Sequence, residues 1–360
     1  MLIYQFQKET SERSEMHNWV LSELSASKLY YYAGFEGCNE NLDNTCTAIL
    51  DRASIEVSGN LDDLPSIESV RNVVSELEGV SLSGKINFCN RLGIPFTYIL
   101  YNYDNEFVLR YEFSLKGTVF RERYNSFQAF SEWIQSIKQW TSGKKYREIA
   151  DLPEFDKALR RSGCPWPTNI DCVAFSINHT PLAIIEFQNA KTTGVLWHNN
   201  NSFFLPYWDS YSKSYKRGRD EQRWRSQDIL RLQSELPHLT IVWSQKEDSA
   251  IVKLLDTVAF PDYGANNVEK VYMKSLNDYR ISIEKNPRER KNDLYHSIRS
   301  RFRTYHLNFN DGHMGTIVNE PPLSFEEKTF PFLYGKRYPA SQKGQFRLFF
   351  EGILSSFITT

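Results

Sequence analysis

Three polar residues, Asp171, Glu186 and Gln188, have the chemistry of a metal site and lie near the two ends of residues 170–188. Glu186 and Gln188 are two residues apart, so in a strand they face the same side. If Asp171 lies opposite Gln188 on a paired strand, it is diagonal to Glu186, about 7–8 Å away before side-chain reach is counted. Two carboxylates at this distance can share a hard divalent ion, chiefly Mg²⁺ or Mn²⁺, which keeps coordination sites for water and phosphate.

The segment that carries these residues is predicted to be a β-hairpin. Its two apolar runs, Cys172–Ile177 and Leu182–Phe187, are of strand length and rich in β-branched and aromatic residues. The residues between them are turn formers, and a turn centred on His179 and Thr180 sets the first acid opposite the amide. Both strands are apolar on both faces, as in a covered central pair, where buried carboxylates need a cation. The alternative to a metal site is that Asp171 has a structural role only, as a residue that caps a turn.

This arrangement resembles the PD-(D/E)XK nuclease superfamily, which has an acid on one strand, Glu-x-Lys or a variant on its partner, and then a helix and a strand. The resemblance covers residues 147–245. It implies an α/β fold with a restriction-endonuclease-like mixed sheet flanked by helices. It also implies that Asp171 and Glu186 bind Mg²⁺ (or Mn²⁺), that Gln188 takes the place usually held by Lys, and that Glu154 is a further metal acid on the preceding helix.

The activity that this resemblance implies is metal-dependent hydrolysis of phosphodiester bonds in DNA, in an antiviral defence or restriction role. The ion would lower the pKa of a bound water and neutralise charge on the phosphate. Gln188 neither titrates near neutrality nor carries charge, so it would position the attacking water by hydrogen bonding. Two alternatives stay open: a catalytically inactive module of the same fold that binds nucleic acid or protein, and a nuclease that acts on RNA.

One strand of the family core is not evident in the sequence. The family places a strand ahead of the one that begins with the acid, and residues 164–169 are too short and too rich in proline to supply it. Either this strand is reduced, or another segment such as Thr193–His198 completes the sheet.

A helix is predicted over Trp224–Glu235, because Ile229, Leu232 and Leu236 recur at i, i+3 and i+7. The run Leu239–Ser244 then predicts a buried strand.

Basic side chains gather before and on this helix, interleaved with Trp and Tyr, a mixture that suits a phosphate backbone and unstacked bases. The predicted nucleic-acid contacts are Lys216, Arg217, Arg219 and Arg223. A solvated helix face with i,i+4 ion pairs is the alternative for each of them. The net charge of −1 provides no global basic field, so any nucleic-acid surface must be local.

Length and composition predict a folded, soluble protein of two or three cores, because the chain has 360 residues of which 41% are hydrophobic. We expect an N-terminal α/β accessory module over 1–143, a nuclease core over 144–262 and a C-terminal extension over 263–360. The N-terminus is polar and no run of about 18 apolar residues occurs, which predicts a cytoplasmic protein with no membrane segment. The five cysteines lack metal-ligand spacing and are read as reduced thiols.

Local patterns predict further elements: strands over 96–102 and 107–113, and helices over 66–78, 154–161 and from the cap residue Ser126. Asp51 and Glu56 faintly echo the acids of the later hairpin, so this strand is either a degenerate nuclease-like repeat or an ordinary strand with a charged edge. The arginine-rich stretch Asn286–Arg303 is either a phosphate contact or a balanced helix face. The tail Gln345–Ile358 is apolar enough to dock or to form a homo-oligomer or partner contact.

Overall fold

The computed structural model describes residues 1–8, 15–141, 152–165, 167–189, 207–209, 214–216, 221–244, 249–259, 299–308, 314–318 and 345–358. The chain forms two compact units, which are described separately. The first contains Met1–Ile184 and Ile229–Leu236, and the second contains Ile185–Asp228 and Pro237–Thr360. The boundary therefore falls inside a strand of the predicted hairpin, and the three-part division expected from the sequence stays a prediction.

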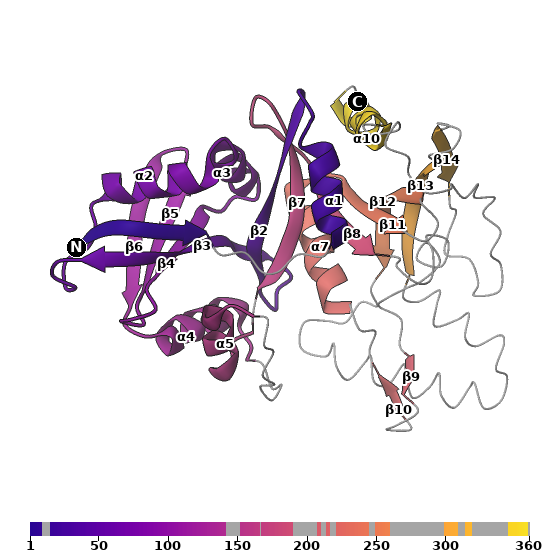
Figure 1. Cartoon of the computed structure of the whole chain (residues 1–360). Coiled ribbons are helices and arrows are strands. Elements are labelled where there is room, and N and C mark those ends of the chain that lie inside the picture. Colours follow the sequence, from indigo (N-terminus) through magenta and orange to yellow (C-terminus); the bar gives the residue numbers. More distant parts are fainter. Residues whose placement is uncertain are drawn as a thin grey trace. The chain divides into compact units, whose positions relative to one another are not determined.

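The first unit is built on a mixed β-sheet (Figure 1). Its strands are β1 (Leu2–Lys8), β2 (Tyr30–Glu40), β3 (Cys46–Ser58), β4 (Phe96–Tyr101), β5 (Val108–Ser114), β6 (Gly117–Tyr124) and β7 (Thr168–Ser176). The order is β7-β2-β3-β4-β5-β6, and β1 pairs with the second half of β3. The pair β3–β4 is parallel, whereas β2–β7, β2–β3, β4–β5 and β5–β6 are antiparallel. The strand beside β7 is therefore β2, supplied by the N-terminal part of the chain.

Helices cover both faces of this sheet. They are α1 (Glu15–Leu24), α2 (Ile67–Glu78), α3 (Ser81–Arg91), α4 (Phe127–Lys138) and α5 (Glu154–Arg161). Figure 1 shows α2 and α3 on one face and α4 and α5 on the other. The alternation of β4 matches this arrangement, because Tyr98 packs in the core under α2 and α3, and Tyr101 packs in the core under α4 and α5. The prediction of an α/β protein with a mixed sheet flanked by helices is confirmed.

Short-range sequence signals account for the helix boundaries in this unit. The Ser66 and Ser126 side chains accept hydrogen bonds from the third backbone N–H beyond them, Ser69 N and Ala129 N (both 3.1 Å), as N-caps do. The predicted helices over 66–78, 154–161 and after Ser126 are all confirmed.

A charged cluster lies buried between the sheet and helices α2 and α3. Lys85 of α3 is 1% exposed and pairs with Asp51 of β3 and with Glu78 of α2, the latter at 2.6 Å between Nζ and Oε2. Lys8 of β1 also contacts Glu78, and the Tyr98 hydroxyl donates to the same carboxylate (3.1 Å). Burial raises the pKa of Glu78, but the positive charges of Lys85 and Lys8 outweigh it and lower that pKa to about 2. The Glu78 carboxylate therefore stays ionised at neutral pH.

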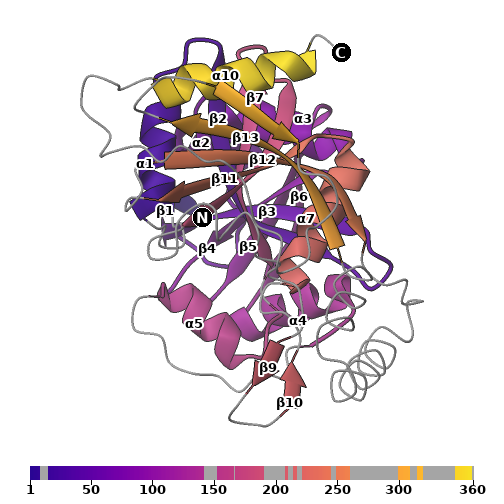
Figure 2. The ribbon, with the colours of Figure 1, turned by 90° about the vertical axis from the view of Figure 1, so that its right-hand side faces the viewer.

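The second unit contains a sheet that begins at β8 (Pro181–Asn189), whose first residues belong to the first unit. Its other elements are β9 (Tyr207–Asp209), β10 (Ser214–Lys216), the first part of α7 (Glu221–Ser234), β11 (His238–Ser244), β12 (Ser249–Ala259), β13 (Arg299–Asn308), β14 (Met314–Val318) and α10 (Gln345–Ile358). The residues of α7 from Ile229 on belong to the first unit. The sheet order is β8-β11-β12-β13-β14, and Figure 2 looks onto β11, β12 and β13. Strands β9 and β10 form a separate pair.

The C-terminal part differs in one respect from expectation. Residues 299–303, interpreted as part of a possible helix face, lie in the strand β13, which pairs with β12 on one side and β14 on the other. Arginine has no strong preference against a strand once neighbouring strands pair with it. The tail forms α10, in which Phe346 and Phe350 are buried and stacked on each other, so it packs within its own chain.

Strands β3 and β8 share a short sequence pattern in which three apolar residues precede an acid: Ala48-Ile49-Leu50-Asp51 in β3 and Ala183-Ile184-Ile185-Glu186 in β8. The order of elements around the two strands differs, because the part of the chain after β8 also contains β9, β10 and β14. Both interpretations of Asp51, a degenerate repeat or an ordinary strand with a charged edge, therefore stay predictions.

Candidate active site

The predicted acidic hairpin forms, but its turn lies earlier in the chain than the sequence indicated. Ser176 N donates to Thr180 O (2.9 Å) and His179 N donates to Ser176 O (2.9 Å). The loop is therefore Ile177–His179, and His179 adopts the left-handed conformation (φ 62°) that such a three-residue loop requires. The prediction of a turn centred on His179 and Thr180 was wrong, because Thr180 already pairs with Ser176. The register that set Asp171 opposite Gln188 started from that turn and loses its basis.

Asp171 belongs to the first unit and lies inside β7 rather than at its start. Its side chain is 6% exposed and accepts a hydrogen bond from Asn169 Nδ2 (2.8 Å). Strand β7 is buried along Ile170–Phe175, as expected for a covered strand. The predicted burial of Asp171 is thus confirmed.

Glu186 belongs to the second unit, is 3% exposed and is held by two side chains from α7. Arg223 Nη2 lies 2.5 Å from Glu186 Oε1, and Gln227 Nε2 donates to Glu186 Oε2 at 3.2 Å. Arg223 was predicted to contact phosphate, whereas the structure places its guanidinium on this carboxylate. An ion pair of this kind compensates a buried negative charge that would otherwise be costly.

Gln188 follows Glu186 by two residues and lies in the same unit. Its Oε1 atom is buried and has no hydrogen-bond partner among the residues that the structure describes. Buried amide oxygens in folded proteins nearly always have a partner, either protein or ordered water. The Gln188 carbonyl oxygen is therefore placed to accept a hydrogen bond from a water molecule or another ligand.

Two further residues of this region, Gln227 and His238, were missed by the sequence analysis. Gln227 is 1% exposed and His238 is fully buried, and His238 Nε2 lies 3.1 Å from Gln227 Oε1. The apolar periodicity assigned to α7 concealed them, since Leu232, expected to be buried, is 61% exposed, and Leu230 is buried in its place. Buried amide side chains nearly always have hydrogen-bond partners, so the buried Gln227 side chain serves to make polar contacts.

Of the other predicted site residues, the structure describes Glu154 and Lys216. Glu154 begins α5, where its 63% exposed carboxylate pairs with Lys157 (2.7 Å). Lys216 ends the short strand β10, and Arg217 and Arg219 lie outside the described residues. Within the described ranges, no three His, Cys, Asp or Glu side chains form a metal-binding group.

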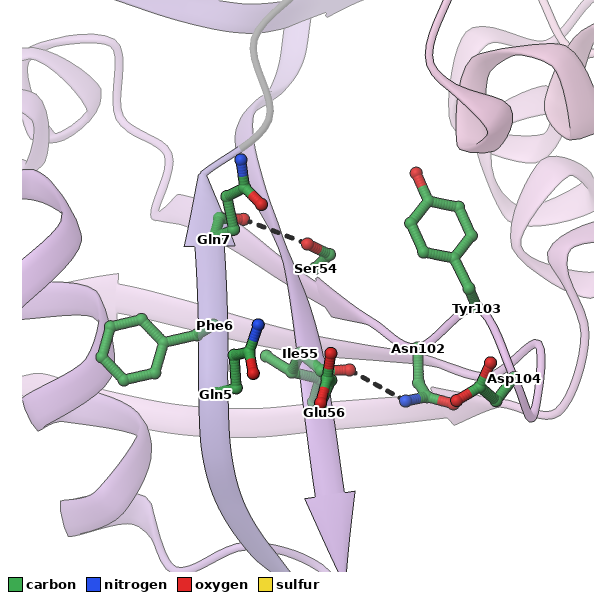
Figure 3. Close-up of a pocket in the computed structure, with 9 residues that line it drawn as sticks. All are labelled: Gln5, Phe6, Gln7, Ser54, Ile55, Glu56, Asn102, Tyr103 and Asp104. Atoms are coloured by element: carbon green, nitrogen blue, oxygen red, sulfur yellow. Dashed lines mark hydrogen bonds between the residues drawn. The ribbon is translucent and has the colours of Figure 1, made fainter.

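A small pocket lies elsewhere in the first unit, beside β1, β3 and the residues that follow β4 (Figure 3). Glu56, Tyr103 and Asp104 line it together with amide side chains. The Asn102 amide donates to the backbone carbonyl of Ile55 (2.8 Å) at its edge. None of the predicted site residues lines this pocket.

Comparison with known proteins yields no match: no family model, no curated protein and no solved structure matches the chain. None of the helices in the described part of the chain is long and apolar enough to cross a membrane.

Proposed function

We propose that this chain is a metal-dependent nuclease with a PD-(D/E)XK-like core that hydrolyses phosphodiester bonds in DNA. The observation that carries the proposal is the pair Glu186 and Gln188: a buried carboxylate, and two residues later a buried amide oxygen without a protein partner in the described residues. In the resemblance to the PD-(D/E)XK superfamily, these residues correspond to the second and third positions of the motif. A purely structural role for the acid would not explain why a buried acceptor beside it is left without a hydrogen bond.

Carboxylates are the type of donor that a hard divalent ion prefers. Asp171 and Glu186 offer carboxylate oxygens, and both are buried, so each prefers a positive partner. Asp171 and Glu186 would hold Mg²⁺ or Mn²⁺, with Glu154 a less direct candidate because it is exposed. When bound, such an ion supplies Lewis-acid activation of water and charge neutralisation at the phosphate.

The protein's own side chains would divide the remaining work. Gln188 Oε1 accepts a hydrogen bond from the attacking water and fixes its direction, because an amide oxygen accepts but does not titrate. Arg223 neutralises Glu186 while no ion is bound, and its 37% exposed side chain can swing to solvent or to a substrate phosphate. This resting role differs from the direct phosphate contact predicted from sequence.

The Gln188 variants test the proposal. Wild-type protein should cleave plasmid DNA with Mg²⁺, at least as fast with Mn²⁺, and not in EDTA. Gln188→Ala should lower the rate about 10²-fold, as the loss of a positioned catalytic group does, whereas Gln188→Lys should retain or raise it. The measurement is single-turnover cleavage of DNA and of matched RNA, and the RNA series decides the substrate. Cleavage that is indifferent to Gln188→Ala would refute the role of this residue.

A second candidate, a catalytically inactive module of the same fold, is favoured by the Arg223–Glu186 ion pair. The first unit has a similar ion pair, in which Asp51 of β3 pairs with Lys85 of α3. When a helix supplies the positive partner of a buried acid and no metal replaces that partner, the ion pair has a structural role only. Wild-type protein that neither cleaves DNA or RNA nor binds Mn²⁺ would establish this alternative.

Substrate binding gives a separate prediction for the basic segment. Lys216, Arg217 and Arg219 are proposed phosphate contacts, so replacing all three with Gln should weaken binding of every DNA sequence alike. The slope of log affinity against log salt should become shallower by about 0.9 per lost contact on duplex DNA. Fluorescence anisotropy across a salt series measures this slope. An unchanged slope would show that these residues do not contact phosphate and belong to a solvated surface.

A further inference from the structure

Glu186 is held at both of its oxygens by one helix. Oε1 faces Arg223 and Oε2 faces Gln227, and these two residues are four apart on α7, on one helix face. The Gln227 amide in turn meets His238, the first residue of β11. The result is a buried chain from His238 through Gln227 to Glu186, in which the three residues are 0–3% exposed.

The chemistry of the chain fixes the direction of each hydrogen bond. An ionised carboxylate only accepts, so the Gln227 group that faces Glu186 must be its NH₂. The carbonyl oxygen of Gln227 therefore faces His238, and His238 Nε2 must carry the hydrogen that it donates. His238 thus prevents the Gln227 amide from flipping, because a flipped amide would point its oxygen at the Glu186 carboxylate.

We infer that Gln227 is a positioning residue for Glu186, and that His238 is the residue that orients Gln227. This inference rests on the proposed metal site, in which Glu186 is a ligand. A ligand carboxylate whose second oxygen is hydrogen-bonded presents its first oxygen in a defined direction, and loss of such outer-shell partners typically costs metal affinity. Arg223 occupies that first oxygen in the ion-free protein, so Gln227 is the partner that can remain when an ion displaces Arg223.

Another glutamine of α7 provides a matched control. Gln233 bonds only backbone groups in the described structure: its Oε1 accepts from Cys46 N (2.9 Å), and its Nε2 donates to Leu92 O (2.8 Å) and Cys46 O. Its role is structural. Gln227→Met and Gln233→Met both remove an amide of α7 and keep the side-chain length, but only the first removes a contact to Glu186.

The test is a Mn²⁺ titration of the full-length protein, followed by electron paramagnetic resonance, with thermal unfolding measured in parallel. Gln227→Met should weaken Mn²⁺ binding about 10–100-fold. Gln233→Met should lower Tm and leave the Mn²⁺ Kd unchanged. For His238, the variant His238→Gln keeps a donor toward Gln227 and should bind Mn²⁺ better than His238→Leu, which has none.

The outcomes separate this inference from the proposed function. Wild-type protein that binds Mn²⁺ and cleaves DNA, together with an unchanged Kd in Gln227→Met, would overturn the positioning role alone. Wild-type protein that binds no Mn²⁺ would overturn the metal site itself. If Gln227→Met fails to fold, the His238→Gln and His238→Leu pair decides, and equal Kd values for the two would overturn the inference.

Discussion

Glu186→Ala is expected to lower the rate of metal-dependent DNA cleavage at least about 10³-fold. A bound divalent ion contributes several kcal/mol to stabilisation of the transition state, and each 1.36 kcal/mol corresponds to a factor of ten in rate. The loss should appear in kcat as well as in Mn²⁺ affinity, because the carboxylate is a ligand in the proposed site. Asp171→Ala should have a similar effect. Single-turnover cleavage of plasmid DNA at saturating Mn²⁺ measures both.

The fold should survive the Glu186 change, which makes this prediction interpretable. Arg223 loses its partner, but its side chain is 37% exposed and can be solvated, and a buried negative charge disappears. Glu122→Ala is the control, since Glu122 is a 50% exposed acid on β6 that pairs with Arg110. Circular dichroism should be unchanged in both variants. Full activity of Glu186→Ala and Asp171→Ala would remove these residues from the site.

Lys85→Ala is expected to have the largest effect on stability, a loss of about 3–5 kcal/mol in the free energy of unfolding. Removing one partner of a buried ion pair leaves an uncompensated charge, and here Lys85, 1% exposed, serves both Asp51 and Glu78. Lys8 still contacts Glu78, but its side chain is 25% exposed and so compensates less. The free energy comes from urea unfolding followed by fluorescence.

The control for this stability prediction is Arg121→Ala on β6, which removes a 47% exposed partner of Glu112 and leaves Arg110 in contact with that carboxylate. Surface ion pairs contribute little, so its unfolding midpoint should stay close to that of wild type. The double variant Lys85→Met with Asp51→Asn should recover part of the loss, because it removes one of the two stranded carboxylate charges. A Lys85→Ala protein as stable as wild type would show that water already reaches the cluster.

Local patterns in the sequence were enough for most elements of the described structure. The hydroxyl of Ser126 and the apolar residues after it specified α4, and the apolar runs around 172–177 and 182–187 specified the strands of the hairpin. The burial of Asp171 and Glu186 also followed from strands that are apolar on both faces. Caps and strand alternation act over a few residues, so a single sequence reveals them.

Only the tertiary structure decided which groups meet these elements. Nothing near Asp171 in the sequence indicated that β2 would pair with β7, or that Arg223 and Gln227 would bind Glu186 from α7. The exposure of Leu232 likewise depends on which side of α7 packs against the protein. Contacts between residues tens of positions apart are chosen by the packing and charge compensation of the whole core. Periodicity therefore located the acids of the candidate site, whereas the partners that hold them became apparent only once the chain was folded.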